Sequence, residues 1–269
     1  MIRFFASRLV RPLSLCAAVL LLLAGCGGGD TPNVQIQQVD RSPAIEGATA
    51  RITTPADSAV VDSADADVVV EADSFETGTQ TDTDRAEEIA NSDDGQHFHV
   101  IVDNEPYLAN YEADTSFDIG TLEPGAHTLV AFPSRSYHES VKSPEGLDVV
   151  NFYVEEDSGS FMLEPDDSAI IYSRPKGTYS GDDAERIMLD FYLHNVDLSE
   201  DGYKARYTIQ STDSDEELAS ITLTEWAPAF VTGLESGTYD VRLQLLDEDG
   251  EVVSGEFNDT TREIEVDTE

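Results

Sequence analysis

The sequence predicts an all-β protein built from two tandem β-sandwich domains. Apolar runs of strand length recur at short spacing, and no long segment has the period of an amphipathic helix. One turn-and-strand pattern also occurs twice, starting at Leu122 and again 112 residues later at Leu234. A repeat of that length is typical of a duplicated domain.

The repeated pattern is a tight turn that leads into a strand. Leu122-Glu123-Pro124-Gly125-Ala126-His127 runs on to Phe132, and Leu234-Glu235-Ser236-Gly237-Thr238-Tyr239 runs on to Leu246. The second copy resembles the tyrosine corner of immunoglobulin-like and fibronectin type III-like sandwiches, in which a tyrosine bonds back to the backbone just upstream. The resemblance implies two immunoglobulin-like domains, and it gives the corner position of the first domain to His127.

The first domain is expected over residues 51–157. Residues 73–95 are rich in Asp and Glu and lack a strand pattern, so they are expected to form a mobile acidic insert between the second and third strands. The expected strands are 52–55, 68–70, 98–102, 116–119, 127–132 and 149–154.

The second domain is expected over residues 168–269 and repeats this order. Its hairpin turn is Asp247-Glu248-Asp249-Gly250, since Asp-Gly is a strong hairpin signal. The expected strands are 170–172, 187–193, 203–209, 221–224, 230–231, 239–246 and 262–266.

The N-terminus predicts an exported protein. Arg3, Arg8 and Arg11 precede a short apolar segment, 13–23, which is too short for a membrane span and typical of a secretory signal. The segment ends in Leu23-Ala24-Gly25-Cys26, which resembles the lipobox of bacterial lipoproteins. The resemblance implies that residues 1–25 are a signal peptide, that Cys26 carries lipid, and that the protein is anchored in the cell envelope. Gly27 stands where an Asp would retain an enteric lipoprotein in the inner membrane, so the outer membrane is favoured.

Residues 26–50 contain Gly, Pro and Gln with little apolar periodicity, so they are expected to form a flexible tether between the lipid and the domains. The sequence holds two cysteines, Cys16 and Cys26. The first leaves with the signal and the second is lipidated, so no disulfide or thiolate metal site is expected in the domains.

The charge is strongly negative, with 15 Lys+Arg against 55 Asp+Glu and a net charge of −40. Removal of the signal peptide takes away three Arg and no acidic residue, which leaves 12 against 55, or −43. Such a surface disfavours nucleic acid and anionic membranes as partners. Two interpretations stay open: calcium binding at acidic loops, or a salt-adapted surface, since abundant Asp/Glu with little Lys resembles the proteins of halophiles.

No motif predicts an enzyme. The sequence lacks GxSxG, HExxH, a phosphate-binding loop and CxxC. We therefore expect a non-enzymatic binding or structural module, with an envelope protein or a glycan as partner.

His97 and His99 lie two apart on an expected strand, so they share one face about 6.6 Å apart along the chain. Together with His138 they form a candidate zinc or copper site, because imidazoles are ligands that both metals accept. The repeat aligns the first two with Lys204 and Arg206, which predicts that they face solvent. The alternative is a pair of exposed histidines that binds no metal.

The loop after the strand 127–132 is the candidate binding loop. It holds Arg135, Tyr137, His138 and Glu139 in one short run. In an immunoglobulin-like sandwich the loops before the third strand and after the sixth lie at the same end. The acidic insert, His97 and this loop should therefore converge, and this end of the first domain is the expected binding end.

Overall fold

The computed structural model describes residues 34–214 and 216–269 and confirms the all-β prediction. Within those residues only two short helical segments occur, η1 (Asp84–Glu87) and α1 (Asp182–Glu185). No helix in this part of the chain is long and apolar enough to cross a membrane. The predicted signal peptide and the lipidation site Cys26 lie outside the described residues.

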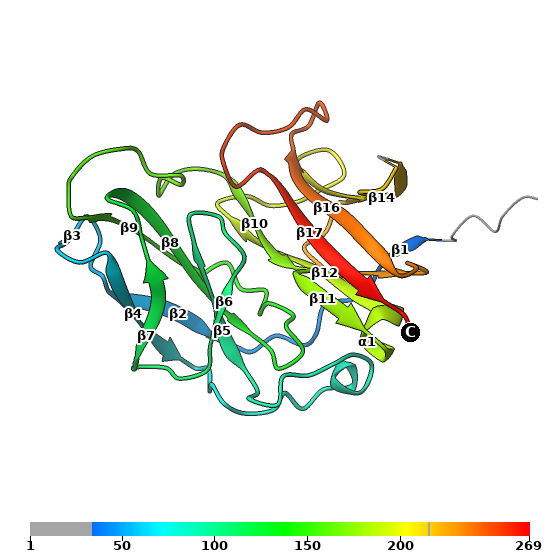
Figure 1. Cartoon of the computed structure of the whole chain (residues 1–269), viewed down its shortest axis with the longest axis horizontal. Helices are drawn as coiled ribbons and strands as arrows, with labels where there is room; N and C mark the ends of the chain where they lie inside the picture. The colour runs from blue at the N-terminus through cyan, green and yellow to red at the C-terminus, as the bar shows by residue number, and fades with distance from the viewer. Residues whose placement is uncertain (1–33, 215) are drawn as a thin grey trace, which may run out of the picture. The chain divides into compact units, whose positions relative to one another are not determined.

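The first sandwich packs a three-stranded sheet, β2-β4-β7, against a five-stranded sheet, β3-β9-β8-β5-β6 (Figure 1). Alternate residues of the strands point into the core, and Val68, Phe98 and Leu129 are fully buried there. The strands are β2 (Thr49–Thr54), β3 (Val60–Val61), β4 (Asp65–Asp73), β5 (His97–Val102), β6 (Leu108–Asn110), β7 (Ser116–Thr121), β8 (Gly125–Ser134) and β9 (Asp148–Val154).

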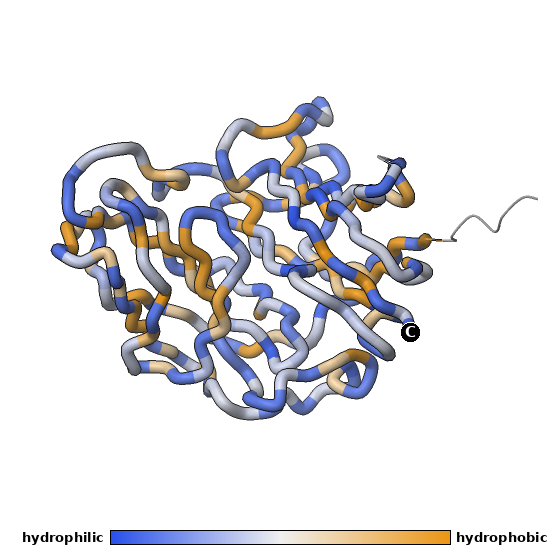
Figure 2. The backbone as a smooth tube through the Cα atoms, viewed as in Figure 1, coloured by the Kyte–Doolittle hydropathy of each residue, from blue (hydrophilic) through white to orange (hydrophobic). Residues whose placement is uncertain are grey.

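The second sandwich packs a four-stranded sheet, β1-β15-β12-β10, against a five-stranded sheet, β11-β17-β16-β13-β14. Ile170, Phe191 and Tyr207 are fully buried in its core. Apolar stretches fall on the strands and hydrophilic residues on most outer loops (Figure 2). The strands are β1 (Gln35–Gln38), β10 (Ala169–Arg174), β11 (Gly177–Ser180), β12 (Arg186–His194), β13 (Lys204–Ser211), β14 (Glu217–Leu223), β15 (Ala229–Thr232), β16 (Gly237–Leu246) and β17 (Asp259–Asp267).

The predicted tether does not extend over residues 34–50. Strand β1 pairs with the edge strand β15 in an antiparallel register, with Ile36 opposite Val231. Val34 and Ile36 pack against the core of the second sandwich. The prediction was wrong here because the alternating apolar residues are only two, which is too few to distinguish a short edge strand from a linker.

The predicted mobility of the acidic insert is also corrected. Its backbone is bonded to the β8–β9 connection at two points: Thr81 N donates to Ser136 Oγ at 3.1 Å, and Ser92 N donates to the Ser136 carbonyl at 2.8 Å. The short helix η1 lies between them. These contacts could not be predicted from the sequence. They are made by backbone groups and small polar side chains, which leave no periodic pattern.

The two sandwiches share a buried interface. Ile101 of β5 and Phe132 of β8 cluster with Ile171 of β10 and Tyr192 of β12, and each is at most 1 % exposed. The Phe132 and Tyr192 rings lie 4.7 Å apart. Both faces of β5 are therefore interior, one in the core of its own sandwich and one against the second sandwich.

The predicted corner is present in both sandwiches. Tyr239 donates its hydroxyl hydrogen to the Glu235 carbonyl at 2.9 Å, and His127 Nε2 lies 2.7 Å from the Glu123 carbonyl. Both bonds reach back four residues. This confirms the prediction that His127 replaces tyrosine at the corner of the first domain.

Candidate metal centre

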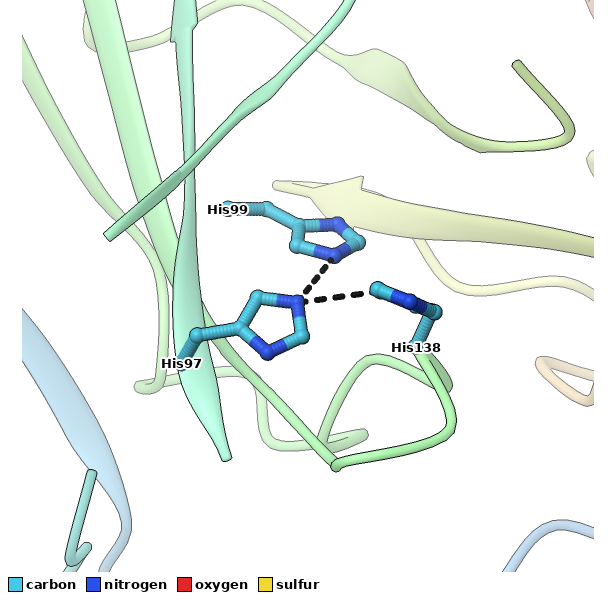
Figure 3. Close-up of side chains that lie close together, drawn as sticks. All are labelled: His97, His99 and His138. Atoms are coloured by element: carbon cyan, nitrogen blue, oxygen red, sulfur yellow. Dashed lines mark hydrogen bonds between the residues drawn. The ribbon is translucent and has the colours of Figure 1, made fainter. Parts of the chain in front are cut away.

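Three imidazoles meet at the interface of the two sandwiches (Figure 3). His99 Nε2 and His138 Nδ1 each lie 3.1 Å from His97 Nε2. The three candidate ligand atoms all lie within 4.8 Å of one another. The predicted grouping of these residues is thus present in the structure.

The predicted exposure of His97 and His99 was wrong, since neither has any exposed surface. The repeat placed them correctly on the side of β5 that faces away from the core of its own sandwich. That side is covered by the second sandwich, as the 3.1 Å contact of His99 Nδ1 with Ser173 Oγ of β10 shows. Aligning the two repeats shows which face of a strand points away from the core of its own domain. It does not show whether the other domain packs on that face.

His138 comes from the connection between β8 and β9. A tight turn closed by the bonds His138 N to Arg135 O and Arg135 N to Glu139 O, each 2.9 Å, places it there. Its φ of +66° lies in the left-handed region, which is uncommon for residues other than glycine, although histidine adopts it more often than most. The turn aims its ring at His97.

A hydrogen bond at the His97 ring fixes which of its nitrogens can bind a metal. His97 Nδ1 lies 2.9 Å from the Gly95 carbonyl, which can only accept, so this nitrogen carries the hydrogen and Nε2 keeps a lone pair. His99 Nδ1 faces the Ser173 hydroxyl. Outer contacts of this kind orient the imidazole ligands of metal sites.

The Nε2 atom of His97 has two close nitrogen neighbours. His97 Nε2 has one lone pair but two nitrogen neighbours at 3.1 Å, so it cannot accept a good hydrogen bond from both. A metal would accept a lone pair from each ring. In a tetrahedral zinc site with Zn–N of about 2.0–2.1 Å, ligand nitrogens lie roughly 3.3 Å apart, close to the two separations seen here.

The three rings are held neutral. Burial lowers the pKa of His97 to about 4 and the pKa of His138 to about 2, and it lowers the pKa of His99 well below its usual range. The nearby cations Arg174 and Lys176 depress each of these pKa values further. Neutral imidazole is the form that binds metals, so the cluster does not need to lose protons at neutral pH.

Aromatic rings and two cations enclose the cluster. Tyr107 stacks on His99 with ring centroids 3.5 Å apart, and Tyr111 lies 4.7 Å from His97. Arg174 Nη1 donates to the Tyr107 hydroxyl at 2.9 Å, and Lys176 Nζ donates to the Tyr107 carbonyl at 2.6 Å. The Tyr107 hydroxyl also lies 3.3 Å from His138 Nδ1.

Sequence reasoning missed Tyr107, Arg174 and Lys176. Arg174 and Lys176 could have been singled out, because two basic residues flank Pro175 in a chain that has only 15 of them. No signal existed for Tyr107, because it reaches His99 through the pairing of β6 with β5. The groups arrive from both sandwiches, so no local spacing in the sequence records their contact.

The other residues of the candidate binding loop are buried. Glu139 accepts hydrogen bonds from Ser42 N at 2.8 Å and Ser42 Oγ at 2.7 Å, and Tyr137 donates to Ser42 Oγ at 2.8 Å. Arg135 Nη2 donates to the Pro43 carbonyl. The predicted convergence of insert, strand and loop is confirmed, but Arg135, Tyr137 and Glu139 bind the chain's own N-terminal segment instead of facing solvent.

No family model matches the chain, and no curated protein matches it. Solved structures with a similar arrangement include the fibronectin(III)-like modules of Clostridium thermocellum CbhA, with 13 % identity, a TM-score of 0.28 and coverage of 82 % of this chain and 95 % of that one. Another is dimeric latent PorU from Porphyromonas gingivalis, at 13 % identity and a TM-score of 0.27, covering 89 % and 21 %.

A third is SGBP-B of the Bacteroides ovatus mixed-linkage glucan utilization locus, solved in complex with a mixed-linkage heptasaccharide. It has 12 % identity and a TM-score of 0.22, with coverage of 81 % of this chain and 47 % of that one. Likeness at this level concerns the β-sandwich fold alone. It transfers neither a ligand nor an activity to this chain.

Proposed function

We propose that this protein is a non-enzymatic module that binds a zinc or copper ion through His97, His99 and His138. The observation that carries the proposal is the pair of 3.1 Å nitrogen contacts at His97 Nε2. Outer contacts with Gly95 and Ser173 orient the rings of His97 and His99 before any metal arrives.

The ligand chemistry favours zinc and copper. Three imidazoles suit both ions, whereas calcium and magnesium prefer oxygen ligands. Among the residues that the structure describes, neither a carboxylate nor a thiolate belongs to the cluster. Three protein ligands leave a fourth position of a tetrahedral ion open, which is the arrangement of sites that bind an exogenous ligand.

Calorimetry with Zn²⁺ and with Cu²⁺ on metal-stripped protein tests the proposal. We expect one ion per chain, with a Kd of micromolar or below, and a loss of at least tenfold in affinity for His97→Gln and for His99→Gln. His138→Asn should behave likewise, and asparagine tolerates the left-handed backbone at this position. His194→Gln is the matched control, because His194 bonds to Pro165 O in the second sandwich.

The thermal stability of each variant without metal shows whether it is folded. Absence of binding in a folded wild type, or equal binding by the wild type and the three cluster variants, would contradict the proposal. From the sequence alone, the affinity for metal is expected to fall as the pH drops through ~6.5, because free histidine is protonated there. Because the pKa of His97 is lowered to about 4, the loss of metal affinity is expected near that pH instead.

We also propose that the module is a lipoprotein of the cell envelope, anchored through Cys26, with the outer membrane favoured. This rests on the residues from Leu23 to Cys26. Residues 34–43 are bonded to the body of the protein. Cys26→Ser should abolish lipid labelling and processing; a variant that is still processed and labelled would contradict the anchor.

A further inference from the structure

A cavity of about 240 Å³ lies beside His138. Three basic residues line it, Arg174, Lys176 and Arg186, against a single acidic residue, the exposed Asp183. The whole chain has 15 Lys+Arg against 55 Asp+Glu. A wall with this excess of cations is therefore contrary to the composition of the protein, and it indicates a place for an anion.

Arg174 lines this cavity and carries a donor that is not used within the described part of the protein. Its Nη1 donates to the Tyr107 hydroxyl, whereas its Nε is buried and has no hydrogen-bond partner among the described residues. A buried donor without an acceptor is costly, and most such groups in proteins are bonded. The edge of a guanidinium that includes Nε is the one that grips carboxylate and phosphate oxygens in pairs.

The charges of the site also call for an anion. His97, His99 and His138 bring no negative charge, and the charged groups that act on them are the cations Arg174 and Lys176. The buried carboxylate of Asp190 acts on Arg174 but is already paired with Lys142. A divalent ion bound to the histidines would add two more positive charges. Buried charge of one sign is unfavourable unless a counter-charge accompanies it.

We propose that the cavity binds a small oxyanion of the carboxylate or phosphate class, held by Arg174 and Lys176, with one oxygen on the open position of the metal. The coupling to metal rests on the proposed function; the cavity and its cations do not. Arg186 contributes less, because it stacks 4.0 Å over the Phe230 ring and pairs with Glu88 at 3.3 Å.

The test uses Co²⁺ as a coloured substitute for zinc, with acetate and inorganic phosphate as probes. Calorimetry measures anion binding to the metal-free and the Co²⁺-loaded full chain, and the visible bands of Co²⁺ report any change in its ligands. We expect one of the two anions to bind, to shift the bands, and to bind more tightly to the loaded protein. The anion that binds identifies carboxylate or phosphate chemistry.

Lys176→Gln should weaken anion binding roughly tenfold or more, the loss expected for one hydrogen bond to a charged group. Lys204→Gln is the matched control, because Lys204 lies on β13 of the second sandwich and bonds to Gly202 O. Binding that is absent for both anions, or reduced equally in the two variants, would overturn the proposal. A missing Co²⁺ spectrum would instead overturn the metal site and the coupling, while calorimetry on the metal-free chain still decides whether the cavity binds an anion.

Discussion

Strands β5 and β13 hold equivalent places in the two sandwiches but have opposite surroundings. His99 lies opposite Phe132, and Arg206 lies opposite Gln244, so the registers correspond. Arg206 is half-buried and donates to Gln244 Oε1 on an outward polar sheet face. His99 is fully buried because the second sandwich covers the matching face of the first.

The difference shows that the covering element, not the strand, decides the chemistry of this position. An open face accepts a cation that keeps its hydration. A covered face excludes charge, holds its histidines neutral and brings them into contact with one another. The same duplication thus produces a solvated face in one domain and a candidate metal centre in the other.

The largest effect is expected from exchanging the residues of the two strands. His99→Arg buries a cation without a carboxylate partner, and we expect it to lower the free energy of unfolding by roughly 3–5 kcal/mol. Arg206→His changes a half-exposed position and should cost about 1 kcal/mol or less. Urea unfolding of both variants in the presence of a chelator measures the difference. Similar small costs would mean that the second sandwich does not cover β5 in solution.

The second largest effect is expected from lowering the pH, which should destabilise the protein through its buried histidines. An unfolded histidine has a pKa near 6.5, whereas the native pKa of His97 is about 4. Between these values the unfolded chain binds more protons, so stability falls as the pH drops. One such group accounts for about 3 kcal/mol across this window at 1.36 kcal/mol per pH unit.

Metal-free wild type and His97→Gln should therefore be compared by urea unfolding from pH 7 to pH 4.5. The variant should lose less stability, because it lacks one of the titrating groups. Carboxylates titrate in both proteins and cancel in the comparison. Parallel curves would show that the native pKa of His97 is not depressed.

In both sandwiches the core strands could be predicted from the sequence and the short edge strands could not. The core strands leave apolar patterns of strand length in the sequence: alternating ones in β4 and β17, and nearly continuous ones in β8 and β12. The short edge strands β1, β3, β6 and β11 were missed, since two to four residues give no measurable period. The ordered insert was missed for a similar reason, as hydrogen bonds to Ser136 leave no pattern.

The candidate site was predicted in part. The strand spacing grouped His97 with His99, and the shared end of an immunoglobulin-like sandwich brought His138 to them. Their burial, and the roles of Tyr107 and Arg174, depend on the packing of one sandwich on the other. That packing brings together residues that are far apart in the sequence, such as His99 and Ser173, which are separated by 74 positions.

A smaller effect, common to both sandwiches, should follow from salt. The net charge is −43 without the signal peptide, and screening shortens from about 10 Å at 0.1 M to about 3 Å at 1 M ionic strength. We expect Tm to rise by at least ~4 °C between ~0.1 M and ~2 M KCl, or roughly 1–2 kcal/mol for a chain of this size. A flat profile would contradict the salt-adapted interpretation, and an equal gain in low-millimolar CaCl₂ would favour calcium sites.

The smallest expected difference lies at the two corners. Tyr239→Phe removes the single bond from the hydroxyl to Glu235 O, which should cost about 0.5–1 kcal/mol. His127→Phe removes the bond to Glu123 O and a 2.5 Å contact with Asp103, so we expect about 1–1.5 kcal/mol. Asp103 also accepts from Thr128 N at 2.8 Å, and its carboxylate would lose one of two partners. Urea unfolding of the two variants at pH 7 tests the order; a larger cost for Tyr239→Phe would show that the histidine corner stabilises its sandwich less than the tyrosine it replaces.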